Sequence, residues 1–171
     1  MKVRRFDLLA GVALATGLLT VPVAQANEVF SAKLLGDSEV PPNNTPGTAT
    51  FQMQIDTTTT TITFTLTFSG LSGAPSVAHL HFAPTNVVGN VMIFLCGGGG
   101  QPACPTATSG TISGTITTTN VVGPTAQGIA AGDLTSALEA VREGLSYANM
   151  HTANFPAGEI RGQVRRNRHG D

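Results

Sequence analysis

Residues 50–68 read TFQMQIDTTTTTITFTLTF, and apolar and polar side chains alternate on both sides of its central polar run. Alternation with a period of two is typical of a half-buried β-strand. The polar run that starts at Asp56 predicts a turn, so the two flanking segments should form an antiparallel hairpin. This stretch therefore predicts a sheet with one face in the core and a threonine-rich face toward solvent.

Similar patterns predict further strands, at residues 77–82, 91–95, 110–117, 145–152 and 159–165. The run 91–95 is apolar on both faces, which predicts a central, fully buried strand. One short helix is predicted near residues 134–143, because Asp133 is a suitable N-cap and Gly144 a suitable stop. The predicted fold is all-β: an antiparallel β-sandwich or barrel with this helix closing one end.

The N-terminus has the pattern of a signal peptide over residues 1–26. A basic start precedes an apolar run and the small-residue site Ala24-Gln25-Ala26. The run is shorter than the about 20 residues that cross a bilayer, and no later segment approaches that length. We therefore expect an exported protein, periplasmic or extracellular, without a transmembrane segment in the mature chain. Residues 27–165 should form one domain and residues 166–171 a disordered basic tail.

The charge balance argues against nucleic acid as a partner. Without residues 1–26, acidic side chains outnumber basic ones by three, and threonine outnumbers all charged residues together. Nucleic-acid-binding domains instead carry a basic surface. The expected partner is an unidentified protein or another surface ligand, and the sequence does not name it.

Cys96 and Cys104 flank the glycine-rich segment Gly97–Ala103. In an exported chain, two cysteines this close most simply form a disulfide, which the loop-entropy model values at about 2.5 kcal/mol. The alternative is a pair of thiolate metal ligands, although the spacing is not that of a C-x-x-C site.

His79 and His81 lie two apart on a predicted strand, so they share a face, roughly 6.5 to 7 Å apart at the backbone. With His151 they could bind one Cu or Zn ion, since both metals accept imidazole nitrogen. Glu159 is a possible fourth ligand if the last hairpin pairs it with His151. In the alternative interpretation, His81 and His151 are hydrogen-bonded to backbone near strand ends, and Glu159 and Arg161 form an exposed pair.

Four segments of the chain resemble a known family. They are His79-Leu-His81-Phe-Ala-Pro84, Val91-Met-Ile-Phe-Leu95, Tyr147-Ala-Asn-Met-His151-Thr152 and Phe155-Pro-Ala-Gly-Glu159-Ile-Arg161-Gly162-Gln163. Together they resemble the CHRD domain, found repeated in the developmental antagonist chordin and singly in exported microbial proteins. The resemblance implies an immunoglobulin-like β-sandwich or barrel outside the cytoplasm and no agreed activity. Phe82-Ala83 departs from the glycine that commonly follows the second histidine.

Two hypotheses follow for function. The first is an exported binding or structural module, favoured over an enzyme because no complete catalytic constellation is recognisable. The second is a protein that binds one Cu or Zn ion through His79, His81 and His151, with redox chemistry as one use of that site.

Overall fold

The computed structural model describes residues 27–167, so the predicted signal peptide and residues 168–171 lie outside the described residues. Its β-strands are β1 Glu28–Leu35, β2 Thr48–Ile55, β3 Ile62–Ser69, β4 Pro75–Phe82, β5 Asn90–Cys96, β6 Gly110–Ile116, β7 Ser146–Thr152, β8 Ile160–Gln163 and β9 Arg165–Arg166. Its helices are the 3₁₀ turns η1 Gly36–Ser38, η2 Thr118–Asn120 and η3 Thr125–Gln127, and the α-helix α1 Leu134–Arg142.

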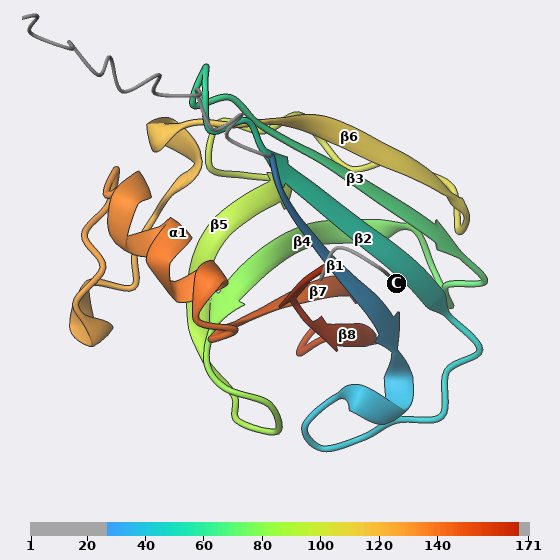
Figure 1. The fold of residues 1–171 in the computed structure, drawn as a ribbon. Helices are drawn as coiled ribbons and strands as arrows, with labels where there is room; N and C mark the ends of the chain where they lie inside the picture. The colour runs from blue at the N-terminus through green and yellow to red at the C-terminus, as the bar shows by residue number, and fades with distance from the viewer. Residues whose placement is uncertain (1–26, 168–171) are drawn as a thin grey trace, which may run out of the picture.

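All strands belong to one antiparallel sheet in the order β5-β4-β7-β8-β1-β2-β3-β6, with β9 paired to β1. The sheet curls into a nearly closed barrel, and β5 and β6 are its two ends (Figure 1). An isolated bridge between Ile93 and Val121 ties β5 to the chain that follows β6. The all-β antiparallel sandwich or barrel with one helix is therefore confirmed.

The predicted hairpin is the regular β2–β3 pair, in which Ile55 lies opposite Ile62 and Phe51 opposite Leu66. Its inward side chains are buried, and the rings of Phe51 and Phe64 stack with centroids 6.5 Å apart. Its outward threonines and glutamines are exposed. Alternation therefore separates core from solvent in this half of the barrel, as the sequence predicts.

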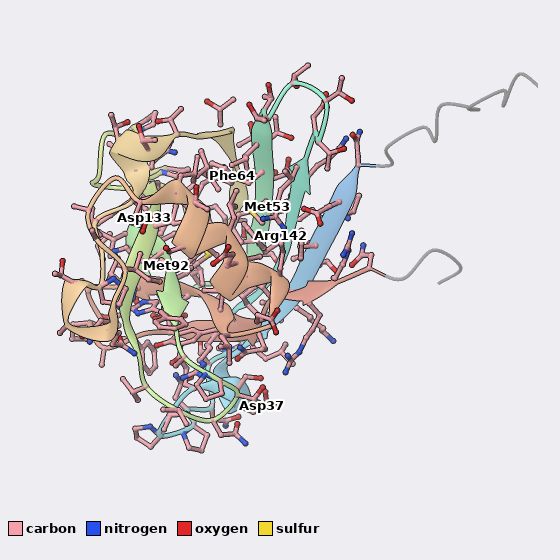
Figure 2. All side chains as sticks on the ribbon, turned by 60° about the vertical axis from the view of Figure 1, so that its left-hand side comes forward. Asp37, Met53, Phe64, Met92, Asp133 and Arg142 are labelled. Carbon is pink, nitrogen blue, oxygen red and sulfur yellow. A yellow bond between two sulfur atoms is a disulfide. The ribbon has the colours of Figure 1, made fainter. Side chains whose placement is uncertain are left out.

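The helix α1 begins where the sequence predicts, because the Asp133 carboxylate accepts the Ser136 N–H at 3.0 Å. It ends before Gly144, whose φ of 70° suits glycine. Ala137 and Val141 are fully buried in the core. Figure 2 shows α1 in front of the space between β5, which carries Met92, and the β2–β3 hairpin. The helix therefore closes one side of the barrel.

Residues 91–95 do form a strand, but the prediction that this strand is central in the sheet is wrong. β5 is the end strand of the sheet and pairs along its length with β4 alone. Met92, Ile93 and Leu95 are fully buried, whereas Val91 and Phe94 are half-buried, so the predicted burial holds only in part. The segment after β6 covers this edge, where Val122 N–H donates to the Met92 carbonyl at 3.0 Å. Burial of an apolar strand on both faces does not require a strand on both sides.

Two further predictions concern the loops and the C-terminus. Cys96 and Cys104 form a disulfide, which removes them as metal ligands. Arg166 and Asn167 do not begin a free tail: Arg166 pairs with Phe30 in the sheet, and Asn167 N–H donates to the Val29 carbonyl at 2.8 Å. None of the helices within residues 27–167 is long and apolar enough to span a membrane.

Candidate metal centre

The three predicted ligand histidines come from two neighbouring strands. In the β4–β7 ladder His79 lies opposite Asn149, His81 opposite Tyr147 and His151 opposite Val77. These side chains point away from the core, because Ala78 and Leu80 of β4 face it. Here the outer face of the sheet is covered by loops, so each histidine is less than 10 % exposed.

The three imidazoles converge on one point. Ring centroids are 5.3 Å apart for His79 and His81, 5.1 Å for His79 and His151, and 6.0 Å for His81 and His151. One ring nitrogen from each lies within 4.8 Å of the others. The sheet therefore brings together side chains that are seventy residues apart in sequence.

Hydrogen bonds to loop carbonyls set the tautomers of two of these rings. His81 Nδ1 lies 3.0 Å from the Gly89 carbonyl and His151 Nδ1 lies 3.0 Å from the Pro156 carbonyl. A carbonyl only accepts, so in the neutral rings Nδ1 carries the proton and Nε2 keeps its lone pair. Metal-ligating histidines commonly donate their second nitrogen to such an acceptor. The backbone hydrogen bonds expected in the alternative interpretation thus exist, and they leave the other nitrogens available.

Three buried imidazole nitrogens have no hydrogen-bond partner within residues 27–167. They are His79 Nδ1, His81 Nε2 and His151 Nε2. Leaving a buried polar atom unpaired costs about 1–3 kcal/mol. Three such atoms on converging rings need a shared explanation, and a bound ion would satisfy them.

The electrostatics keep the histidines neutral. Burial lowers the pKa of His79 to about 3, with further lowering by His81 and His151. Burial likewise lowers the pKa of His81 to about 4, although its hydrogen bond to Gly89 opposes this, and burial lowers the pKa of His151. Neutral imidazole is the form that binds a metal, so near neutral pH the site needs to lose no proton before binding.

Aromatic rings hold the cluster in place. The Phe94 ring meets His79 edge-on at 4.5 Å between centroids, and the Tyr147 ring is parallel to His81 at 4.7 Å. The Arg161 guanidinium lies 3.5 Å from the centre of the Tyr147 ring. Because β4 and β8 flank β7 on opposite sides, Tyr147 lies between His81 and Arg161. These contacts limit the rotation of the imidazoles.

Glu159 lies outside the histidine group. In the antiparallel β7–β8 ladder, Met150 pairs with Ile160. The next position along each strand therefore places residue 159 opposite His151, which is the register that the sequence analysis considered. The carboxylate nevertheless accepts hydrogen bonds from Thr45 Oγ1 at 2.7 Å, Thr152 Oγ1 at 2.6 Å, and both the N–H and the hydroxyl of Ser72 at 2.7 and 2.8 Å. Burial raises its pKa, but these donors together outweigh burial and hold it below the ordinary value. Glu159 therefore ties loops to the end of the sheet.

The expected exposed pair of Glu159 and Arg161 is also wrong. Glu159 is completely buried and Arg161 is 3 % exposed, and the two form no ion pair. Arg161 instead donates to loop carbonyls, with Nη2 2.8 Å from Val87 O. A charged residue on an alternating strand is expected at the surface, but the loops that cover this face reverse that expectation.

Sequence reasoning missed two polar residues beside the site. Asn149 is 2 % exposed, and its amide donates to Glu39 Oε1 at 2.6 Å and to the Ile160 carbonyl at 2.9 Å. Burial raises the pKa of Glu39 to about 7, against the lowering effects of Asn149 and Arg161. The available signal was the spacing of Tyr147, Asn149 and His151, which places all three on one face of β7. Nothing in the sequence pattern links Glu39 to them.

The arrangement can hold a borderline metal ion with three nitrogen ligands. Nitrogens at about 2.0–2.1 Å from one tetrahedral ion lie about 3.3 Å apart. The present spacing of up to 4.8 Å would therefore contract when an ion binds. Within residues 27–167, the potential ligand group contains these three histidines and no carboxylate. A bound ion would therefore keep a coordination position for a water molecule or another ligand.

Comparison with known proteins agrees with the resemblance of the closing motifs. A family model described as the CHRD domain matches residues 30–164, which is nearly all of the described chain. Neither the curated proteins nor the solved structures gave a match. The matched region contains all three histidines and the disulfide, and the chain belongs to the CHRD domain family.

Proposed function

We propose that this CHRD domain is a binding module that works outside the cytoplasm and holds one Cu or Zn ion through His79, His81 and His151. The observation that carries the proposal is a group of three converging imidazoles, each with a buried nitrogen that has no partner in the described chain. Protonated histidines would repel, and neutral ones without a ligand would leave three polar atoms unsatisfied. One ion resolves both costs.

The proposed location rests on the disulfide and on the family. Disulfides persist in oxidising compartments and are rare in the cytoplasm. The Cys96–Cys104 bridge closes a loop next to Phe94, whose ring touches His79, so oxidation also supports the wall of the site. A signal peptide over residues 1–26 would deliver the chain there. The proposal assigns binding to this domain and no catalytic reaction.

The test is metal analysis and titration of protein made without a histidine tag. We expect one Cu or Zn ion per chain, held at least 100-fold more tightly than by the variants His81→Ala and His151→Ala, because each loses one of three ligands. X-ray absorption spectroscopy at the metal edge should show nitrogen ligands at about 2.0–2.1 Å from the ion.

The variant His169→Ala is the matched control, since it removes the chain's remaining histidine. It should keep full metal content. Circular dichroism of each variant checks that the sheet is intact. Metal-free protein that takes up neither ion in titration, or equal uptake by His81→Ala and the parent chain, would refute the proposal.

A further inference from the structure

A second polar site lies on the other side of Tyr147 from the histidines. A hollow of about 350 Å³ opens on the outer face of β8, with Arg161 and Gln163 at its floor. Asp37 and Ser38 of η1 form one wall, and the loop between β4 and β5 forms the other. Figure 1 shows both segments at the same end of the barrel, next to β8. The hollow is therefore bounded by parts of the chain that only the fold brings together.

Arg161 carries a buried charge that makes no ion pair in the described chain, although the nearby carboxyl group of Glu39 interacts with it electrostatically. Arg161 is 3 % exposed, and both ion pairs within residues 27–167 belong to Glu28. Its guanidinium donates only through Nη2, to the Val87 carbonyl at 2.8 Å and the Pro84 carbonyl at 3.4 Å. Nε and Nη1 donate to nothing in the described chain. The Glu39 carboxylate bonds to Asn149 and makes no hydrogen bond to this guanidinium, so Nε and Nη1 are open to an anion from solvent.

The surroundings of the hollow favour an anion of single charge. Lys33 on β1 lines the rim, and the Arg165 guanidinium bonds to Thr85 Oγ1 at 2.8 Å beside it. Asp37 is the one acidic residue among the lining residues. The planar fork of arginine matches the two oxygens of a carboxylate. A carboxylate of one charge gains from Arg161 and Lys33 and is repelled less by Asp37 than a doubly charged phosphate.

We propose that the hollow between η1 and the β4–β5 loop binds a small organic carboxylate, held by the Nε and Nη1 groups of Arg161 and steered by Lys33. The ligand enters from solvent at the Lys33 rim and lies against the hydroxyl and amide groups of Ser38 and Asn86. The carboxylate site shares Tyr147 with the metal centre, since Arg161 and His81 both stack on that ring. Its existence does not depend on the metal.

The experiment titrates metal-free, folded protein with acetate at constant ionic strength and follows the Nε–H signal of Arg161 by NMR. We expect a saturable shift of that signal. Acetamide, which has the shape of acetate without its charge, should leave the signal in place. A parallel titration with inorganic phosphate tests whether the hollow prefers carboxylates or binds any oxyanion. We expect phosphate to bind more weakly than acetate does.

Variants test the two cations separately. Arg161→Lys keeps the charge but loses the fork, and should weaken acetate binding about tenfold. Because residue 161 is buried and that variant could fail to fold, Lys33→Gln at the exposed rim is the second test, with an expected loss of about threefold. Arg166→Gln removes the same charge from a residue that does not line the hollow, and should bind acetate as the parent does.

Three results would overturn the proposal. They are an Arg161 signal that does not respond to acetate, a stronger response to phosphate than to acetate, and an equal loss of affinity in Lys33→Gln and Arg166→Gln. Each of them leaves the metal titration untouched, so failure here is distinguishable from failure of the metal proposal.

Discussion

Side chains alternate between the core and the outer face in both halves of the barrel, but the outer face of β2 and β3 differs from that of β7. Along β2 and β3 the outward side chains are mainly threonine and glutamine, and they are exposed. Along β7 all seven residues are buried, and its outward side chains include Tyr147, Asn149 and His151. One outer face is thus a neutral surface in water, and the other is a polar layer under loops.

The connections at the strand ends explain the difference. A short turn that starts at Asp56 joins β2 to β3, and its Thr58 and Thr59 N–H groups bond back to the Asp56 carboxylate, while the outward threonines and glutamines of both strands stay exposed. The segments that include Gly89 and Pro156 fold back over β4 and β7, and their carbonyls accept hydrogen bonds from His81 and His151. Alternation decides which face a side chain takes, and the loops decide whether that face sees water.

The largest expected loss of stability comes from a core substitution in the β2–β3 half of the barrel, which lacks the histidine site. Phe51→Ala should lower the free energy of unfolding by about 4 kcal/mol, because a fully buried ring that stacks on Phe64 leaves a cavity. Urea unfolding followed by circular dichroism measures it. The metal affinity of the folded fraction should stay at the parent value, and a loss below about 1 kcal/mol would contradict the assignment of Phe51 to the core.

Acidification should lower the stability of the protein through the buried histidines of β4 and β7. The pKa values of His79 and His81 lie near 3 and 4 in the fold and at 6.5 when unfolded, so below pH 6.5 the unfolded chain binds protons that the native chain refuses. Glu39 acts oppositely: its pKa of about 7 in the fold means that it gains a proton, and stability, between pH 7 and its unfolded value of 4.5. We expect a net loss of roughly 2 kcal/mol in metal-free protein between pH 7 and 5.

Denaturant titrations at each pH measure this loss. The variant Glu39→Gln is the control that sharpens it, because removing the opposing carboxyl should make the loss of stability on acidification steeper. Stability that is flat or rises from pH 7 to 5 would show that the histidines are not buried in their neutral form.

Glu159→Gln separates a structural carboxylate from a metal ligand. The substitution removes charge from a group that accepts from Thr45, Thr152 and Ser72, and should cost about 2 kcal/mol of unfolding free energy. Metal affinity should change little. Glu139→Gln on the exposed side of α1 is the matched control, with no measurable effect on stability. A large loss of metal affinity in Glu159→Gln alone would return Glu159 to the ligand set.

The smallest effect is expected on the exposed outer face. Thr65 lies opposite Gln52 and Ser113 and is exposed. Thr65→Val should change the unfolding free energy by no more than about 0.5 kcal/mol, since valine suits a strand and no buried hydrogen bond is lost. Thermal unfolding can detect a larger change, and a loss above about 1 kcal/mol would mean that this face is covered after all.

The candidate site was only partly predictable. His79, His81 and His151 could be found because histidines are few and two of them share a strand face. The exclusion of Glu159 could not, because hydroxyls of Thr45 and Ser72, far away in sequence, take its oxygens. The same holds for Arg161, whose acceptors are carbonyls of a loop with no recognisable pattern.

The sequence did not indicate β1 and left the register of the last hairpin open. By itself, it determined the positions of β2 to β8 and of α1, and the side of the sheet that their alternating residues face. These follow from local periodicity, turn residues and capping, which act over a few residues. Only the tertiary structure decided that β5 is an end strand, that the polar face of β4, β7 and β8 is buried, and that three imidazoles meet with unpaired nitrogens. The reason is that burial and convergence depend on contacts between segments distant in sequence, and no local pattern records them.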